Sequence, residues 1–285
     1  ITDADTNDAD DTVCDDDGFS LTATVGAGEE VDWYDDFCGG NLIGSGSPLP
    51  VSINSATTFY ARARNTTTGC VSANCGTIFV SVNPVPTADA GGDVNVCLGD
   101  PNPTVGGAPT ASGGTGPYTY AWTGTGASFL SDDTAENPTF DAATAGPGSY
   151  QVCVDVSDSN GCFSSTDCAI INVHGLPTAD AGIDFILCED ASDPTVGPGS
   201  ITFGVAVALT YAWTGTGAAF LDDVTAESPT FDVSAAGPGS YQVCVTVTDG
   251  NGCVSATDCA DITINTKPTA DAGSDYVLCE NAADP

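Results

Sequence analysis

The chain has 285 residues, of which 39 are acidic and three are basic, and its formal net charge at pH 7 is −36. A charge of this sign and size repels nucleic acid and anionic membrane and attracts cations or basic partners, so we expect no nucleic-acid partner. No run of 18 apolar residues occurs, which predicts no membrane insertion in this segment. An apolar content of 41% favours folded cores over a disordered acidic chain.

The first acidic stretch, DADTNDADD at 3–11, superficially resembles a calcium-binding EF-hand loop. It lacks the central glycine and the closing glutamate of that loop, and no helical pattern flanks it. We therefore expect no EF-hand there. A looser cation site at a module junction, of the kind described below, is favoured because Asp10 aligns with Asp93.

A repeat of 91 residues organises the rest of the chain. YAWTGTGA at 120–127 returns at 211–218, and GPGSYQVCV at 146–154 returns at 237–245. The hexapeptide PTADAG begins each copy, at 86–91, 177–182 and 268–273. We predict a divergent first module at 1–85, two closely related modules at 86–176 and 177–267, and the start of a further, truncated repeat at 268–285.

Each repeat has the pattern of short strands and turns. In 150–156, apolar residues alternate with polar ones, as in a half-buried strand, and 118–122 is a second strand with a core tryptophan, Trp122. Asn160-Gly161 predicts a two-residue hairpin turn, after which 163–173 returns as the next strand. No stretch of a dozen residues has helical periodicity. The fold class is therefore all-β, and the frequent turns favour β-sandwiches.

Two parts of the sequence resemble modules of large surface proteins. GSYQVCVDVSDSNGC, which follows YAW, resembles the C-terminal half of PKD-type immunoglobulin-like modules, and AGGDVNVC resembles their opening strand in gliding, Bacteroidetes-type bacteria. The first module, from VCDDDGFSL to TTFYARARNTTTGC, is similar to immunoglobulin-like repeats of the same proteins. The chain departs from PKD modules at TGTG after Trp122, where they often carry Phe-Gly-Asp-Gly. The resemblance implies a linear array of tandem, disulfide-stapled immunoglobulin-like (PKD-like) β-sandwiches on a cell surface.

The 13 cysteines indicate disulfides in an oxidising compartment, because they recur at fixed positions without the close pairs and histidines of a zinc site. A two-residue turn at Asn160-Gly161 places Cys153 opposite Cys168, within bonding distance. Elimination then pairs Cys97 with Cys162. The expected bonds are Cys153–Cys168, Cys97–Cys162, their repeats Cys244–Cys259 and Cys188–Cys253, and Cys14–Cys70 with Cys38–Cys75 in the first module. Cys279 is left without a partner.

PTADAG is expected to be the linker between modules, stiffened by its proline. Carboxylate and amide oxygens recur around it and at the hairpin turn, and such oxygen-only ligands suit calcium. The alternative is that these side chains only cap turns and keep the surface soluble. The candidate calcium ligands at the junctions are Asp89, Asp93, Asp158, Asn160, Asp180, Asp184, Asp249, Asn251, Asp271 and Asp275.

No catalytic residues are expected. His174, the single histidine, lies in a linker, and the pairs Asp132-Asp133 and Asp222-Asp223 lie beside turn signals in solvated loops. Possible glycosylation sites are Asn65, in the sequon Asn65-Thr66-Thr67, and Thr12 and Thr134, whose triplets look like O-linked acceptors of Bacteroidetes-type secreted proteins. The calcium ion is the only expected cofactor.

Two functional classes remain open. The first is a structural one: a stalk, adhesin shaft or extracellular filament whose partners are further copies of the same repeats. The second is a carbohydrate-binding or adhesive array, attached to a secreted enzyme or adhesin, that grips a surface polysaccharide. The structural class is favoured because Trp33, Trp122 and Trp213 lie on strands as core residues, and because repetition without variation suits a spacer.

Overall fold

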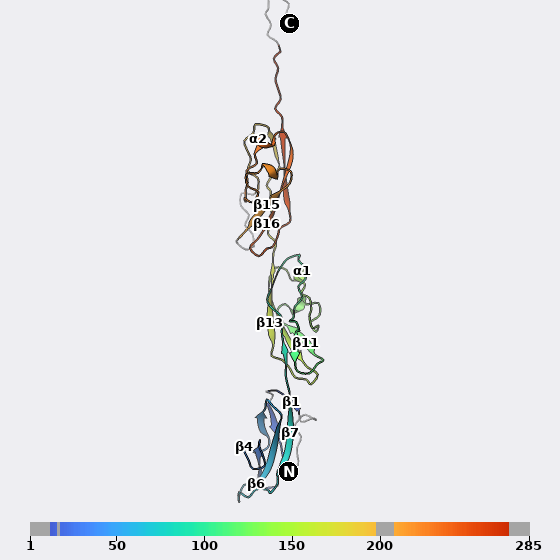
Figure 1. Cartoon of the computed structure of the whole chain (residues 1–285), viewed down its shortest axis with the longest axis vertical. Coiled ribbons are helices and arrows are strands. Elements are labelled where there is room, and N and C mark those ends of the chain that lie inside the picture. Colours follow the sequence, from blue (N-terminus) through green and yellow to red (C-terminus); the bar gives the residue numbers. More distant parts are fainter. Residues whose placement is uncertain (1–11, 16–17, 198–207, 274–285) are drawn as a thin grey trace, which may run out of the picture. The chain divides into compact units, whose positions relative to one another are not determined.

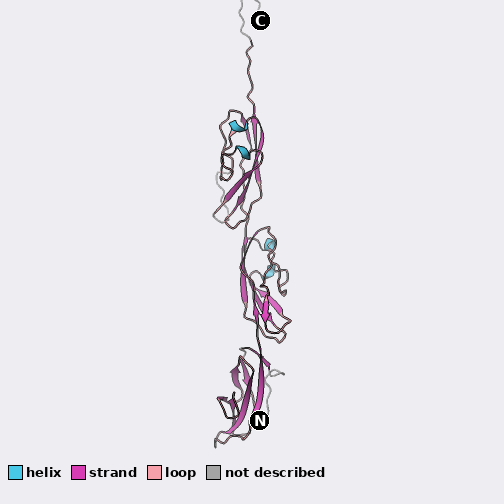
Figure 2. Cartoon of the chain, viewed as in Figure 1, coloured by secondary structure: helices cyan, strands magenta, loops and turns pink. Residues whose placement is uncertain are grey.

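The computed structural model describes residues 12–15, 18–197 and 208–273. Strands dominate it, and its helices are single turns (Figure 2). Every sheet is built from strands of one predicted module, which we name module 1 (1–85), module 2 (86–176) and module 3 (177–267). By contacts, the chain divides into two compact units, one of residues 1–96 and 100–172 and one of residues 97–99 and 173–285. Modules 1 and 2 thus share a unit, and Cys97 is grouped with module 3.

Module 1 is a sandwich of a five-stranded and a two-stranded sheet. The large sheet has the order β1-β7-β6-β3-β4, and β2 pairs with β5 in the small one. Its core holds Leu21, Val31, Trp33, Phe59 and Val80, each at most 2% exposed. The strands are β1 (Thr12–Cys14), β2 (Gly18–Leu21), β3 (Glu29–Tyr34), β4 (Leu42–Ser45), β5 (Leu49–Ser52), β6 (Thr57–Asn65) and β7 (Gly76–Asn83).

Module 2 has a four-stranded sheet of order β11-β12-β13-β9 and a two-stranded sheet of β10 and β8. Two single-turn helices, η1 (Ala127–Phe129) and α1 (Ala142–Ala145), lie in the long connection between β11 and β12. The strands are β8 (Pro86–Ala88), β9 (Val94–Cys97), β10 (Ala111–Gly113), β11 (Thr119–Thr123), β12 (Gly148–Ser157) and β13 (Asp167–His174).

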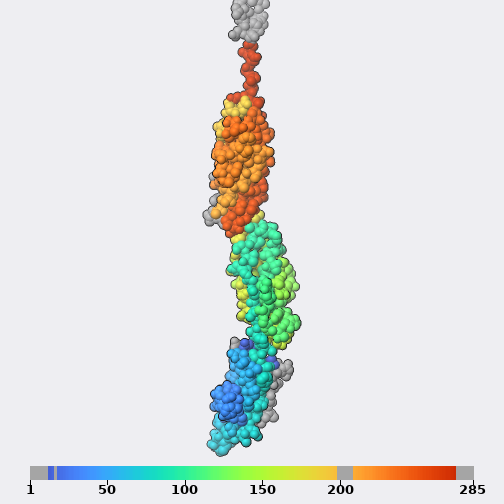
Figure 3. Space-filling model, viewed as in Figure 1, coloured from blue at the N-terminus to red at the C-terminus, as the bar shows by residue number. Residues whose placement is uncertain are grey.

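Module 3 repeats this architecture with the sheet order β14-β17-β16-β15. Trp213, Phe231 and Ile262 occupy its core, as Trp122, Phe140 and Ile171 do in module 2. In the space-filling view its described residues run from yellow through orange to red (Figure 3). Its elements are β14 (Phe185–Cys188), β15 (Thr210–Thr214), η2 (Ala218–Phe220), α2 (Val233–Ala236), β16 (Gly239–Thr248) and β17 (Asp258–Asn265).

The opening strand of a module runs parallel to its last strand. β1 pairs with β7 from Thr12↔Ser81 to Cys14↔Asn83, and the two lie side by side in Figure 1. β14 pairs with β17 from Phe185↔Ile262 to Cys188↔Asn265. The cysteine that ends each opening strand therefore lies beside the residue that ends the last strand. The hairpin turn before the last strand is at the opposite end, about 23 Å away at about 3.3 Å per residue.

In modules 2 and 3 the hexapeptide PTADAG is part of the module that it begins, so the expectation that it is the linker between modules is wrong there. In module 2 its first residues form β8, which pairs with β10, and Ala90 is only 1% exposed. The Ala90 N–H donates to Asp167 Oδ2 at 2.7 Å, and the Ala181 N–H donates to Asp258 Oδ2 at 2.7 Å in module 3. Gly91 has a φ of 83°, and a Cβ there would lie 2.9 Å from the Gly106 carbonyl oxygen. Glycine is therefore required at this bend.

Candidate functional site: cysteines at the two ends of each module

Five disulfides are present among the described residues, and two of them join one module to the next. Cys14 of module 1 is bonded to Cys162 of module 2, and Cys97 of module 2 is bonded to Cys253 of module 3. Their Cα–Cα distances are 5.6 and 5.5 Å, within the usual range for a disulfide. The other three bonds lie within single modules: Cys38–Cys75, Cys153–Cys168 and Cys244–Cys259.

The bonds expected for Cys97–Cys162, Cys188–Cys253 and Cys14–Cys70 do not form. The elimination behind these expected bonds considered only pairings within one module. Parallel pairing of the opening and last strands places the two cysteines at opposite ends. A cysteine at the strand end therefore reaches a turn only in the following module, and Cys70 and Cys188 are free and exposed.

The within-module bonds join the cysteines that sequence reasoning paired. In module 3, Cys244 and Cys259 are direct partners in the β16–β17 ladder. Their Cα atoms are 4.0 Å apart, as are those of Cys153 and Cys168, which is closer than the about 5.5 Å expected of a hydrogen-bonded pair. The turn itself differs from the expected two-residue type. The Asp158 N–H donates to the Cys162 carbonyl at 3.0 Å, so the loop has three residues.

We call Cys14, Cys97 and Cys188 the strand-end cysteines. Each is followed by a residue whose N–H donates to the carbonyl of the residue that ends the last strand. These bonds measure 2.9 Å from Asp15 to Asn83, 2.8 Å from Leu98 to His174 and 3.0 Å from Glu189 to Asn265. The backbone on the C-terminal side of each cysteine is thereby fixed in the same way in all three modules.

We call Cys70, Cys162 and Cys253 the turn cysteines. Each directly follows a glycine with positive φ: Gly69 at 72°, Gly161 at 80° and Gly252 at 86°. The carbonyl of each turn cysteine accepts the N–H of the residue that opens the turn, which is Asn65, Asp158 or Asp249, at 2.8 to 3.0 Å. The turn that presents the cysteine is therefore closed by the same backbone bond in each module.

Aspartate caps the turn in modules 2 and 3. Asp158 Oδ1 accepts the N–H groups of Asn160 and Cys162, and its Oδ2 accepts the Thr115 N–H, all at 2.9 to 3.0 Å. Burial alone raises the pKa of Asp158, but the hydrogen bonds from Thr115, Cys162 and Asn160 outweigh it and hold the pKa below its ordinary value. The carboxylate is therefore ionised at neutral pH and fixes the loop that carries Cys162. Asp249 accepts the N–H groups of Asn251 and Cys253 in the same manner.

The predicted calcium ligands are used as backbone caps in separate places. Asp89, Asp180 and Asp271 each accept the N–H of the glycine two residues later at 2.8 Å. Asp93 and Asp184 accept N–H groups of the last strand at 2.8 Å. Within the described ranges, no three His, Cys, Asp or Glu side chains come together as a metal site. Calcium at the junctions stays a prediction from the sequence. Asp275, Asp10 and the stretch 3–11 lie outside the described residues.

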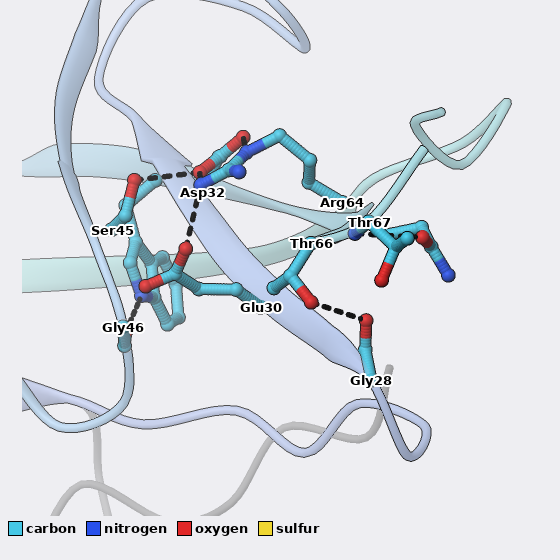
Figure 4. Close-up of polar contacts among 10 residues, drawn as sticks. Gly28, Glu30, Asp32, Ser45, Gly46, Arg64, Thr66 and Thr67 are labelled. Carbon is cyan, nitrogen blue, oxygen red and sulfur yellow. Dashed lines mark hydrogen bonds and ion pairs between the residues drawn. The ribbon is translucent and has the colours of Figure 1, made fainter. Parts of the chain in front are cut away.

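Two of the three basic residues of the chain lie on β6 of module 1. Arg64 donates to both carboxyl oxygens of Asp32, at 2.7 and 3.1 Å, and to Glu30 at 2.6 Å (Figure 4). Asp32 is 5% exposed. Burial raises the pKa of Asp32. The hydrogen bonds from Arg64 and Ser45 and the arginine charges outweigh burial, so the pKa lies below its ordinary value. The cluster therefore fastens β3 to β6 through two ion pairs.

The predicted glycosylation sites have structural roles. Asn65 Oδ1 accepts the N–H groups of Thr67 and Thr68 at 3.1 and 2.9 Å, so this side chain caps the turn before Cys70. The Thr134 hydroxyl donates to Asp132 in an exposed loop, and the Thr12 hydroxyl is 2.9 Å from that of Ser81. Glycosylation at Asn65, Thr12 and Thr134 stays a prediction.

Residues considered for catalysis or ligand binding are accounted for by packing. Trp33, Trp122 and Trp213 are 2–4% exposed, and each indole N–H donates to a backbone carbonyl at 2.9 Å. His174 Nδ1 lies 3.1 Å from Asn251 Nδ2, so the residue that ends β13 contacts the hairpin turn of module 3. The Asp132 and Asp223 side chains cap their own loops.

Comparison with known proteins supports the immunoglobulin-like architecture. Residues 3–84 match the family described as "Ig-like domain CHU_C associated". The first module is thus similar to that family, and the all-β modules form an array of Ig-like repeats. No curated protein matches the chain. Among the described residues, no helix is long and apolar enough to cross a membrane.

Solved structures with similar chains include three multidomain proteins. The three N-terminal domains of the bacteriophage RB49 outer capsid protein Hoc align with 11% identity and a TM-score of 0.45, over 90% of this chain and 97% of that one. The titin fragment I67–I69 aligns with 12% identity and a TM-score of 0.40, over 90% and 95%. Drosophila N-cadherin EC1-4 aligns with 12% identity and a TM-score of 0.36, over 94% and 75%. At these scores the alignments establish neither a shared arrangement nor a function.

Proposed function

We propose that this chain is a segment of an extracellular structural polypeptide, of the stalk, adhesin-shaft or filament kind. In this proposal, disulfides that run from module to module give the array a second covalent connection. The observation that carries it is the pair of bonds Cys14–Cys162 and Cys97–Cys253. Each joins the strand-end cysteine of one module to the turn cysteine of the next.

The mechanical consequence follows from the bond positions. Both the peptide chain and a disulfide connect module 1 to module 2, and the same holds for modules 2 and 3. Tension on the chain therefore has two covalent routes at each of these steps. A single proteolytic cut in the connecting peptide leaves the array joined, which suits a polypeptide exposed to proteases outside the cell.

Composition and redox chemistry support the extracellular location. Five disulfides in a chain of this length are typical of an oxidising compartment. The net charge of −36 keeps such a surface soluble and discourages non-specific association. Ig-like modules are typically not enzymes, and the proposal assigns no catalysis to this chain. It also does not use calcium, which stays a prediction from the sequence.

Carbohydrate binding has less support. Polysaccharide recognition commonly uses exposed aromatic faces, whereas the three tryptophans of this chain are buried in the module cores. A cavity of about 200 Å³ beside Trp33 is lined mainly by residues of the module 1 core, such as Ala23, Ala61 and Ile78. The exposed aromatic residues Phe37, Phe79 and Phe163 belong to three separate loops or strands. The structural role is therefore the function that the geometry favours.

The proposal is tested by cutting the peptide between modules 2 and 3 under load. A specific protease site is inserted between Gly175 and Leu176, and the chain is held by its ends in an optical trap at constant force. We expect the tether to survive cleavage in oxidising buffer and to break after addition of a reductant, because Cys97–Cys253 spans the cut.

The matched control replaces Cys97 and Cys253 by serine and leaves the three within-module bonds intact. This variant is expected to lose its tether on cleavage without any reductant. Loss of the tether in the parent chain under oxidising conditions would show that no second covalent route exists, and the proposed function would then fail.

A further inference from the structure

Two cysteines of the described residues are free, and their positions follow one rule. Cys188 is the strand-end cysteine of module 3, and Cys70 is the turn cysteine of module 1. Cys14 and Cys97, the strand-end cysteines of modules 1 and 2, are each bonded to the next module. Cys162 and Cys253, the turn cysteines of modules 2 and 3, are each bonded to the module before. The free thiols are therefore the two positions for which the described residues contain no module on the bonding side.

The backbone setting of Cys188 is that of a bonded strand-end cysteine. Cys188 pairs with Asn265 in the β14–β17 ladder, as Cys14 pairs with Asn83. The Glu189 N–H donates to the Asn265 carbonyl at 3.0 Å, as Asp15 and Leu98 donate at 2.9 and 2.8 Å. No rearrangement of module 3 is needed to present this thiol.

Solvent exposure separates the free cysteines from their bonded equivalents. Cys162 and Cys253 are 0% and 1% exposed, whereas the equivalent Cys70 is exposed. Cys14 and Cys97 are half-buried, whereas Cys188 is exposed. The bonded state thus covers both sulfur positions, and Cys188 has the exposure of a thiol whose partner is not in place.

We propose that Cys188 forms a disulfide with the turn cysteine of the module that follows module 3 in the same polypeptide. The partner is recognised by its chemistry: a cysteine directly after an Asp-x-Asn-Gly turn, as in 158–162 and 249–253. Residues 268–285 align with 177–194 at the 91-residue interval, Cys279 with Cys188, and this alignment sets the register that the partner module would have. This inference rests on the proposed function and extends its covalent connection by one step.

Bond formation is an oxidation of two thiols. The thiolate of one cysteine attacks glutathione disulfide and releases one glutathione thiolate, and the second cysteine then displaces the other. Two protein thiols and one glutathione disulfide become one protein disulfide and two glutathione molecules. The two protons of the protein thiols end on the glutathione sulfurs.

The test completes the fourth module with the chain's own sequence. Residues 195–267 are appended after Pro285, so that the added module carries a copy of Cys253 in its hairpin turn. Parent and extended chains are refolded in glutathione buffer and then labelled with a maleimide. We expect labelling of Cys188 to fall at least tenfold in the extended chain, and mass mapping to recover Cys188 linked to the copy of Cys253. Cys70 and Cys279 are internal controls, expected to stay labelled in both chains.

The control is the extended chain in which the copy of Cys253 is serine, where Cys188 is expected to be labelled as in the parent. A second extension, built from residues 104–176, offers a copy of Cys162 instead. If Cys188 stays labelled in both extended chains while the Cys97–Cys253 bond forms, this inference is overturned and the proposed function still stands. Linkage of Cys188 to Cys70 of a second chain would also overturn it. Absence of Cys97–Cys253 would defeat the proposed function itself.

Discussion

At the scale of single residues, many acidic side chains accept hydrogen bonds from backbone N–H groups. Asp158 and Asp249 cap hairpin turns, and Asp141 and Asp232 cap single-turn helices. Asp167 and Asp258 each accept a backbone N–H of the PTADAG hexapeptide. Because so few basic residues are present, N–H groups of the backbone supply most of the positive partners for these carboxylates. The repeated acidic residues are thereby explained by turn and strand geometry.

We predict that Asp158→Asn lowers the stability of module 2 at neutral pH and flattens its acid dependence. An amide can accept with one oxygen only, so the Thr115 N–H or the turn N–H groups lose a partner, at a cost of about 1–3 kcal/mol. The pKa of Asp158 is lowered in the folded state, so its stabilisation is present above the ordinary carboxyl range and is lost as pH falls through the folded pKa.

The measurement is urea unfolding between pH 7 and pH 2, followed by the fluorescence of Trp122 in a background with Trp33→Phe and Trp213→Phe. The parent is expected to lose more stability than the variant below about pH 4. Acid limbs that run parallel in the two proteins would show that the carboxylate of Asp158 does not stabilise the turn.

At the scale of elements, the same aromatic group fills modules 2 and 3. The rings of Phe129, Phe140 and Tyr150 have centroids 5.3–5.9 Å apart, and those of Phe220, Phe231 and Tyr241 repeat them at 5.2–5.9 Å. The Tyr150 hydroxyl donates to the Ala145 carbonyl at 2.5 Å, so the ring also anchors the end of α1. This cluster joins the long connection between β11 and β12 to the sheet.

We predict that Phe140→Ala destabilises module 2 by about 3–5 kcal/mol, because Phe140 is 0% exposed and its removal leaves a cavity against two other rings. Phe231→Ala should cost module 3 a similar amount. The matched control is Phe163→Ala, where the ring is 69% exposed and the change should stay within about 0.5 kcal/mol. Differential scanning calorimetry compares the three variants, and equal losses for Phe140→Ala and Phe163→Ala would contradict the core assignment.

At the scale of the whole molecule, sequence reasoning succeeded where the determining contacts are local. Alternation in 150–156 and the hairpin at 157–168 fix the all-β fold and bring Cys153 to Cys168, because those residues are close along the chain. The two bonds between modules, Cys14–Cys162 and Cys97–Cys253, depend on the direction of the opening strand relative to the last strand. That direction is set by pairing between residues far apart along the chain, such as Thr12 with Ser81 and Phe185 with Ile262, which no local pattern contains. One sequence signal pointed elsewhere: pairing within modules left Cys279 without an expected partner.

The sequence alone could not show the roles of the predicted calcium ligands, for a related reason. The aspartates recur at 91-residue intervals and were expected at the same end of each module. Each accepts a hydrogen bond from a backbone N–H group instead. Repetition of a residue type marks a repeated structural role, and only the three-dimensional contacts distinguish a turn cap from a metal ligand. The hexapeptide recurs because three of its residues have structural roles in the module. Its second alanine donates to an aspartate of the last strand, its own aspartate caps the bend, and its glycine adopts the positive φ of that bend.

The most direct test of the account is the identity of the bonds that join modules. The oxidised chain is digested under denaturing conditions with pepsin at low pH, where thiol–disulfide exchange is suppressed, and the linked peptides are identified by mass spectrometry. The account predicts peptides that join Cys14 to Cys162 and Cys97 to Cys253, with Cys70 and Cys188 recovered as free thiols. Recovery of Cys97 joined to Cys162, or of Cys14 joined to Cys70, would contradict it.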